Sequence, residues 1–197
     1  MLLENEPIKY KVMVYIAIFG GLRVGELCNL EWSDIDFDKE TITVSDQLQY
    51  LPEFGIYEVE STKSDSSNRT ISISSTLIEL LKEYKKWQDD EKEKLGDIWI
   101  DLNKLFTQET GKPIFPDTPS KWLKNFTKRN NLKMITFHQL RHTNASILIG
   151  EGVDVATVSG RLGHADKSIT LKIYAHALRQ YDREAADKLQ DVIKKKE

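Results

Sequence analysis

An apolar run over residues 8–19 is followed at once by two glycines, Gly20 and Gly21. Such a run is long enough for a buried helix but well short of the ~20 residues that cross a bilayer. A second helical pattern covers residues 24–32. Because glycine permits sharp turns and a close approach of other backbone, the pair predicts a tight junction between two helices. The chain is therefore expected to start with a helix pair.

The next part of the chain changes to β-type segments. Residues 41–44, 56–59 and 70–73 alternate or favour β-branched residues, and turn formers separate them. This pattern predicts a small antiparallel sheet, in which the polar residues 63–68 form the turn between the last two strands.

Helical patterns fill most of the remaining chain. Thr136 and Gln139 form a T-x-x-Q capping box, Asp154 is a candidate cap, and Gly163 a candidate stop. The expected helices cover residues 77–95, 120–129, 137–150, 154–163 and 168–177. The predicted fold class is mostly α with a small three-stranded antiparallel β-sheet (α+β).

Composition indicates one soluble domain. The chain has 197 residues, 40% hydrophobic and 30% charged, and a chain of this size buries roughly 70% of its unfolded surface. Its N-terminus has neither a basic start nor an apolar block, so no secretory signal is expected. The single cysteine, Cys28, excludes an intrachain disulfide framework and a multi-cysteine zinc site. We expect a cytoplasmic protein without membrane association.

Charge is distributed unevenly. The net charge is -3, yet residues 1–60 carry four Lys/Arg against twelve Asp/Glu, whereas residues 104–179 carry twelve against five. All four histidines also lie in the C-terminal third. Since affinity for phosphate depends on the local field, nucleic acid remains a candidate partner.

The stretch His138-Gln139-Leu140-Arg141-His142 allows two interpretations. Two histidines four residues apart on a helix can bind zinc, but the zinc hydrolases have glutamate where Gln139 stands, and Arg141 would repel the cation. Alternatively, His138 and Arg141 lie one turn apart and can converge on an oxyanion. The second interpretation makes the H-x-x-x-H spacing coincidental and leaves His142 a packing or hydrogen-bonding role.

Further candidates for a phosphate site occur along the chain. Arg23 follows the glycine pair, and Glu26 can hold its guanidinium in place. Lys63 enters a polar turn, His164 follows a glycine, and Tyr174 lies ten residues further on. Clustered positive groups would make this phenol, with an ordinary pKa near 10, a usable nucleophile. Each residue alone has a simpler explanation: a surface ion pair, a solvated lysine, or a tyrosine packed between helices.

The order of these residues carries more information. G-L-R-x-x-E, T-K-S-x-x-S-x-R-x-I, H-x-L-R, L-G-H and a tyrosine follow one another, with L-x-W-S-D-I-D after the first. In this order the chain resembles the catalytic domain of the tyrosine recombinases, the phage-type integrase family, over residues 8–177. The resemblance implies site-specific DNA recombination, the integration or excision of a mobile element.

The resemblance also implies roles. Tyr174 would form a 3′-phosphotyrosyl bond, Arg23 and Arg141 would clamp the phosphate, and Lys63 would protonate the leaving 5′-oxygen. His138 would take the tyrosine proton and His164 would donate a hydrogen bond to the phosphate, with Glu26 beside the first arginine. Because the covalent link keeps the bond energy, no metal and no cofactor are expected.

The same resemblance predicts the partners of the chain. Double-stranded DNA is the expected substrate, with a homo-oligomer, a tetramer in the family, assembled on it. Backbone contacts are expected from a basic set: Lys121, Lys124, Lys128, Arg129 and Lys133. A solubilising helix face is the alternative.

Residues 1–177 form the expected catalytic domain, and residues 178–197 a helical tail that packs in cis or is exchanged between protomers. The family's N-terminal DNA-binding domain is expected to be absent from this chain.

Other functions compatible with parts of the pattern are a non-catalytic DNA-binding remnant, a type IB topoisomerase and a metal hydrolase. The complete set of candidate residues favours catalysis over the remnant. The tail, in which apolar residues recur at helical spacing, favours recombination over the topoisomerase.

Overall fold

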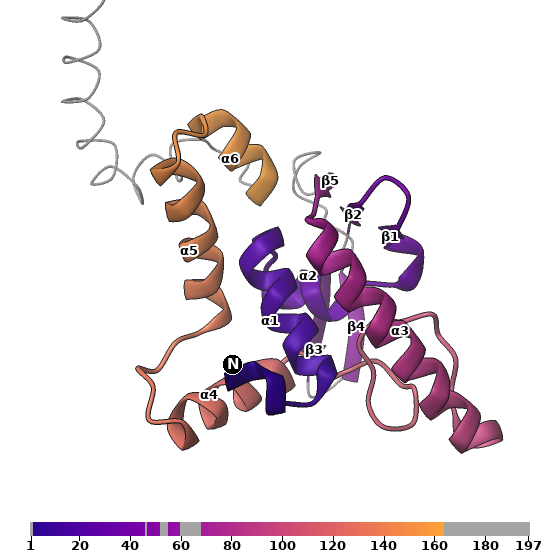
Figure 1. The fold of residues 1–197 in the computed structure, drawn as a ribbon. Helices are drawn as coiled ribbons and strands as arrows, with labels where there is room; N and C mark the ends of the chain where they lie inside the picture. The colour runs from indigo at the N-terminus through magenta and orange to yellow at the C-terminus, as the bar shows by residue number, and fades with distance from the viewer. Residues whose placement is uncertain (1, 46, 52–54, 60–67, 164–197) are drawn as a thin grey trace, which may run out of the picture.

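The computed structural model describes residues 2–45, 47–51, 55–59 and 68–163 (Figure 1). The expected helix over residues 168–177, the tail 178–197 and most of the polar turn 63–68 lie outside the described residues. Helices dominate: α1 (Ile8–Gly20), α2 (Val24–Asn29), α3 (Ser75–Leu95), α4 (Thr118–Arg129), α5 (Phe137–Gly150) and α6 (Val155–Leu162). Short 3-10 turns cover Leu2–Asn5, Trp32–Asp34 and Gly96–Ile98. The predicted fold class is confirmed.

Helix α1 lies at the centre of the molecule. The middle of the apolar run is buried as predicted, with Met13 and Ile16 at 0% exposure, whereas Phe19 near its end is 42% exposed. It contacts α5 on one side and α3 on the other, and α2 packs at its end (Figure 1). A separate small cluster, formed by Ala145 and Ile149 of α5 with Val158 and Leu162 of α6, joins the last two helices.

The glycine pair forms the tight junction expected of it. Gly21 adopts a left-handed conformation with φ 66°, and its backbone N–H donates to the Ala17 carbonyl at 3.1 Å. The chain then enters α2 through Arg23. The second helix ends at Asn29 rather than near Trp32, because the backbone there bonds elsewhere: the Leu105 N–H donates to the Leu30 carbonyl at 2.8 Å.

The strands differ in part from the prediction. Strands β1 (Ile35–Asp36), β2 (Thr41–Val44) and β5 (Arg69–Ser72) form an antiparallel sheet in the order β1-β2-β5, with Ile42 opposite Ile71. Segments 41–44 and 70–73 lie in one antiparallel sheet, as predicted, and pair directly with each other. The assignment of segment 56–59 to this sheet is wrong, since β4 (Gly55–Val59) pairs with β3 (Gln47–Leu51) in a separate two-stranded sheet. β3 precedes β4 directly in the sequence and pairs with it. The third strand of the three-stranded sheet is instead the two-residue β1.

Helix ends follow the local signals. Ser74 caps α3 by accepting from the Leu77 N–H, which starts that helix two residues earlier than predicted. The capping box at α5 is confirmed: the Gln139 N–H donates to the Thr136 hydroxyl, and the Thr136 N–H to the Gln139 side chain. Asp154 caps α6 and Gly163 ends it with φ 64°. Within the part of the chain that is described, no helix is long and apolar enough to cross a membrane.

Substitution of Gly21 tests the junction between α1 and α2. A Cβ at this position would lie 2.6 Å from Leu162 Cδ2, in a backbone conformation that disfavours L side chains. We expect Gly21→Ala to lower the free energy of unfolding by about 2 kcal/mol, measured by urea denaturation. The matched control is Gly160→Ala on α6, where a Cβ meets nothing within 4 Å, and this variant should be as stable as wild type or more so. Equal unfolding midpoints for Gly21→Ala and wild type would contradict the close packing.

Candidate active site

Arg23 and Glu26 are brought together at the start of α2. The Glu26 carboxylate accepts from the Arg23 backbone N–H at 2.8 Å and from Arg23 Nη1 at 2.6 Å. This reciprocal arrangement provides an acceptor for the backbone N–H at the start of α2 and fixes the Arg23 guanidinium, as the i, i+3 spacing suggested. The Arg23 side chain also donates to the carbonyl of Gly163, at the end of α6, at 3.1 Å.

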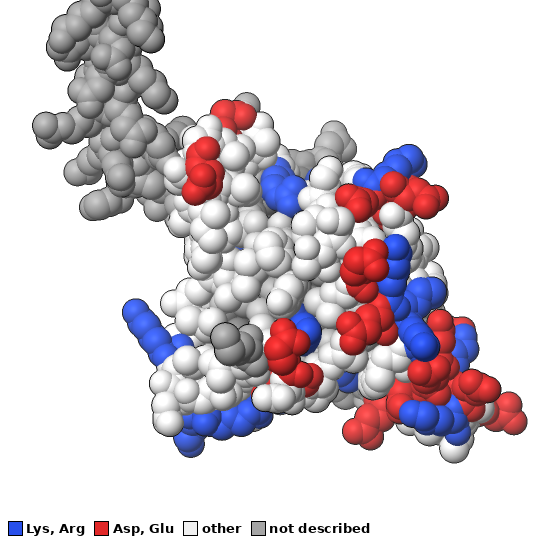
Figure 2. All heavy atoms as spheres, viewed as in Figure 1, with Lys and Arg blue, Asp and Glu red and all other residues white. Residues whose placement is uncertain are grey.

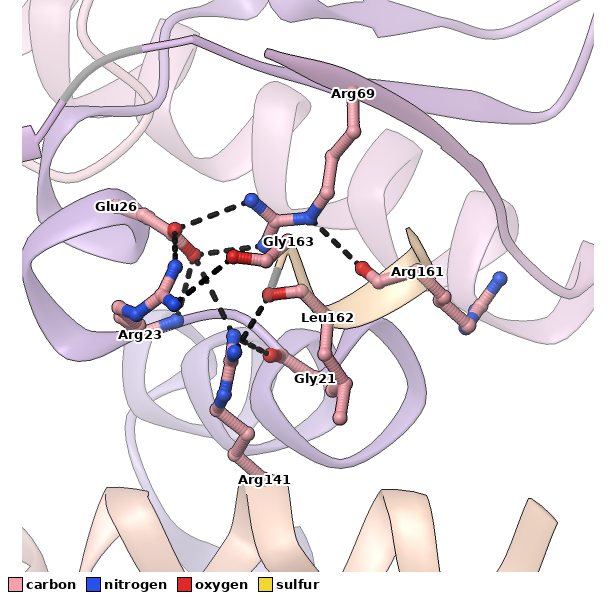
Figure 3. Close-up of polar contacts among 8 residues, drawn as sticks. All are labelled: Gly21, Arg23, Glu26, Arg69, Arg141, Arg161, Leu162 and Gly163. Carbon is pink, nitrogen blue, oxygen red and sulfur yellow. Dashed lines mark hydrogen bonds and ion pairs between the residues drawn. The ribbon is translucent and has the colours of Figure 1, made fainter. Parts of the chain in front are cut away.

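Arg69, the first residue of β5, makes a second and more deeply buried pair with the same carboxylate. Its two terminal nitrogens donate to the two oxygens of Glu26 at 3.1 and 2.8 Å, and its Nε donates to the Arg161 carbonyl at 2.8 Å (Figure 3). Two parallel bonds of this kind are the strongest geometry available to an arginine and a carboxylate. The pair connects the strand that follows the polar turn to α2 and α6.

Arg141 approaches the cluster from the first turns of α5. Its terminal nitrogens donate to the carbonyls of Gly21 at 2.7 Å and Leu162 at 2.5 Å, and Nη1 lies 3.9 Å from Glu26 (Figure 3). Arg141 is thus fixed to two segments of backbone that are distant in the sequence.

One carboxylate therefore faces three guanidinium groups, those of Arg23, Arg69 and Arg141 (Figure 3). The side chains of Glu26, Arg69 and Arg141 are 6%, 7% and 3% exposed, whereas that of Arg23 is 41% exposed. Burial by itself raises the pKa of the Glu26 carboxyl, but the hydrogen bond and charge of Arg69 and the contacts with Arg23 outweigh it and lower that pKa. Two positive charges remain in excess, so the cluster is suited to bind an anion.

Arg69 and Arg161 are the residues that sequence reasoning missed. Arg161 donates to the carbonyls of Phe19 at 2.7 Å and Ser72 at 2.9 Å, so it connects α6 to α1 and to the end of β5. Burial first, and then the charge of Arg69, lower the pKa of Arg161. Arg69 was visible as the arginine of the T-K-S-x-x-S-x-R stretch, but nothing in a strand pattern predicts which arginine turns inward.

His138 and His142 contact each other on α5. Their Nε2 atoms lie 2.7 Å apart, and the rings meet edge to face at 85° with centroids 4.2 Å apart. The H-x-x-x-H spacing thus has a structural consequence, although the sequence alone suggested that it was coincidental. Among the described residues no third His, Cys, Asp or Glu joins them in a group suited to hold a metal ion. Lys63, His164 and Tyr174 lie outside the described residues.

The predicted DNA-contacting residues are exposed on α4 and the segment after it. Figure 2 shows blue side chains over α4 at the lower left, whereas charges of both signs are mixed over α3. Two of the set have acidic neighbours: Lys121 pairs with Asp117 at 2.5 Å, and Arg129 pairs with Glu6. Trp122 packs on the opposite side, stacked on Tyr10 with centroids 4.5 Å apart, and Phe126 is buried.

Known proteins are similar to this chain in sequence and in fold. The sequence model of the phage integrase family matches residues 2–180. A XerC-like tyrosine recombinase from Caldanaerobacter subterraneus subsp. tengcongensis is 36% identical over 94% of this chain and 50% of its own length. The ICEBs1 integrase from Bacillus subtilis is 32% identical over 98% of the chain and 51% of its own length.

A solved structure agrees with these relatives. The Tn1549 transposon integrase in complex with transposon right end DNA superposes with a TM-score of 0.81 at 25% identity, covering 95% of this chain and 62% of that protein. The chain thus spans about half the length of the curated relatives it matches.

Removal of the shared carboxylate tests the arginine cluster. Glu26→Gln leaves Arg69 and Arg141 buried without their counter-ion, and we expect the free energy of unfolding to fall by about 3 kcal/mol. Because the pKa of Glu26 is lowered by folding, its contribution is complete above its ordinary value of 4.5 and is lost as the pH falls through the lowered pKa. Urea unfolding at several pH values measures both effects. The exposed pair of Glu79 with Lys82 provides the control: Glu79→Gln should change stability little, and an equal loss in both variants would contradict the assignment.

Proposed function

The chain belongs to the phage integrase family, and from this premise we propose that it cleaves and rejoins double-stranded DNA at specific sites, to integrate or excise a mobile element. The observation that carries the proposal is the convergence of Arg23 and Arg141 on one carboxylate at the meeting point of α2, α5 and α6. The related integrases and the DNA complex of the Tn1549 integrase support it.

In the proposed reaction Tyr174 attacks a DNA phosphodiester. The phenol oxygen forms a bond to phosphorus, the 5′-oxygen leaves, and a 3′-phosphotyrosyl link remains. His138 takes the proton of the phenol, Lys63 supplies a proton to the leaving 5′-oxygen, and His164 donates a hydrogen bond to the phosphate. Rejoining reverses these steps with the 5′-hydroxyl of another strand. Since the link conserves the energy of the phosphodiester, the scheme uses no nucleotide cofactor and no metal.

Arg23 and Arg141 would stabilise the charge that develops on the non-bridging oxygens. The carbonyls of Gly21 and Leu162 fix Arg141 before any DNA binds, and Glu26 fixes Arg23. Donors that are already in place need no reorganisation as the transition state forms, which is why such preorganised charge accelerates phosphoryl transfer. The greater exposure of Arg23 leaves its guanidinium accessible to an incoming phosphate.

The proposal extends to the assembly. Residues 1–177 act as the catalytic domain and residues 178–197 as a tail exchanged between protomers in a tetramer on DNA. The basic set on and after α4 contacts the DNA backbone and contributes salt-dependent affinity. The reaction takes place in the cytoplasm, and the protein has no membrane partner.

A covalent-adduct assay tests the chemistry. A nicked duplex carrying the attachment site should form a covalent complex with the wild-type chain, seen as a shifted band on a denaturing gel. Tyr174→Phe lacks the nucleophile and should give no band while retaining DNA binding in a mobility-shift assay. A wild-type chain that forms no adduct, or an adduct that persists in Tyr174→Phe, would overturn the proposed reaction.

Replacement of Arg141 by lysine tests the clamp. The charge is kept, but a single ammonium cannot bond two carbonyls and a phosphate in the geometry of a planar guanidinium. We expect Arg141→Lys to slow adduct formation by about a hundredfold or more at saturating DNA. The same variant is checked by thermal unfolding, so that loss of fold is separated from loss of chemistry. A folded variant with near-normal rates would rule out the clamp role.

A further inference from the structure

His142 is a described residue near the proposed site to which the reaction gives no role. It lies one turn after His138 on α5, and the 2.7 Å separation of the two Nε2 atoms is that of a hydrogen bond. The edge-to-face arrangement of the rings directs these two atoms at each other rather than stacking the rings. The contact is therefore a directed polar interaction between two titratable groups.

The contact limits where hydrogens can sit. Only one of the two Nε2 atoms can carry a hydrogen, because two N–H groups cannot point at each other. If His142 donates, His138 must carry its hydrogen on Nδ1, and its one unprotonated nitrogen, Nε2, is already occupied by the hydrogen bond from His142. If His138 donates, its Nδ1 is unprotonated and can accept a proton. The second arrangement alone suits His138 as a base.

The surroundings favour His142 as the acceptor. Burial first, then the charges of His138 and Arg141, lower the pKa of His142, so this ring stays neutral. His138 is exposed, so a proton added to the pair is better solvated on its ring than on the partly buried His142. A neutral acceptor at Nε2 of His142 then stabilises the imidazolium that forms on His138.

We propose that His142 is a positioning residue: its Nε2 accepts the Nε2–H of His138 and holds that ring in the tautomer whose Nδ1 can take the Tyr174 proton. The inference rests on the proposed function. In the step, the phenol O–H bond breaks, the hydrogen moves to Nδ1 of His138, and the oxygen bonds to phosphorus. The resulting imidazolium keeps its Nε2–H directed at His142, as a carboxylate directs the histidine of a serine hydrolase.

A role in stability alone predicts different behaviour. A side-chain pair at i, i+4 on a helix surface contributes only about 0.2–0.5 kcal/mol. Loss of His142 should therefore leave thermal unfolding almost unchanged, while its effect on the chemistry should be large. This separation of stability from rate distinguishes a positioning residue from a structural one.

Ring ¹⁵N chemical shifts test the hydrogen positions without DNA. In the full chain at neutral pH, His142 should carry its hydrogen on Nδ1, the tautomer that an isolated imidazole disfavours, and His138 should carry its hydrogen on Nε2. In His142→Leu the His138 signals should shift toward those of a freely exchanging ring. A hydrogen on Nε2 of His142 would overturn the inference, whatever the chain does with DNA.

Single-turnover adduct formation on the nicked attachment-site duplex tests the consequence. His142→Leu should slow the reaction about tenfold to a hundredfold at saturating DNA, a part of the 10²–10⁴ that a general base contributes. His142→Gln, whose amide oxygen can accept near the position of Nε2, should restore most of the rate. The control is Thr143→Ala, the next residue on α5, which should react like wild type.

The outcomes separate the two proposals. If wild type forms the adduct and His142→Leu matches its rate, the inference is overturned and the proposed function stands. If both His142 variants are slowed equally, acceptance by position 142 is not what matters, and the inference is again overturned. If wild type forms no adduct, the proposed function fails together with the catalytic part of the inference, and the ring shifts still decide which histidine donates.

Discussion

The site depends on one buried carboxylate. Glu26 is removed from water, which by itself costs several kcal/mol, and the structure offsets this cost by surrounding it with Arg23, Arg69 and Arg141. Each arginine comes from a different element, and each also binds a backbone carbonyl at the α1–α2 junction or at the end of α6. A displacement of any one element would leave a charge buried without its partner. The same contacts therefore fix both the geometry of the site and the packing of the helices.

This arrangement has a functional consequence beyond stability. Three guanidinium groups around one carboxylate leave excess positive charge, and the buried arginines cannot be neutralised by water or salt as surface charges are. Hydrogen bonds to backbone carbonyls offset the repulsion between the like charges. Arg141 donates to the carbonyls of Gly21 and Leu162, and Arg23 donates to that of Gly163. An anionic phosphate would relieve the same repulsion, so the local charge matters more than the net charge of -3.

Local signals predicted the parts of the fold that local interactions determine. Three such features could be predicted from the sequence: the capping box of Thr136 and Gln139, the cap at Asp154 and the turn at Gly21. In each of them the hydrogen bonds join residues only a few positions apart. The partner of segment 56–59 was not, since strand pairing depends on non-local neighbours, and a two-residue strand such as β1 has no periodicity to detect. The inward direction of Arg69 likewise depends on a carboxylate 43 residues away, which no spacing rule predicts. The order of the motifs identified the candidate residues. The hydrogen bonds and ion pairs that join Arg23, Glu26 and Arg141 are visible only in the structure.

The histidine pair shows how the same spacing can serve different chemistry. At i, i+4 on a helix two imidazoles can hold a metal ion together or share a hydrogen, and the choice falls to the residues between them. Here Gln139 is engaged in the capping box and Arg141 brings a positive charge next to the rings, which opposes a cation but favours keeping His142 neutral. The arginine that is proposed to bind phosphate thus also adds to the effect of burial and of His138, which lower the pKa of the His142 ring next to the proposed base. In the proposed reaction, the clamp and the base therefore lie within about one turn of α5 and are not independent of each other.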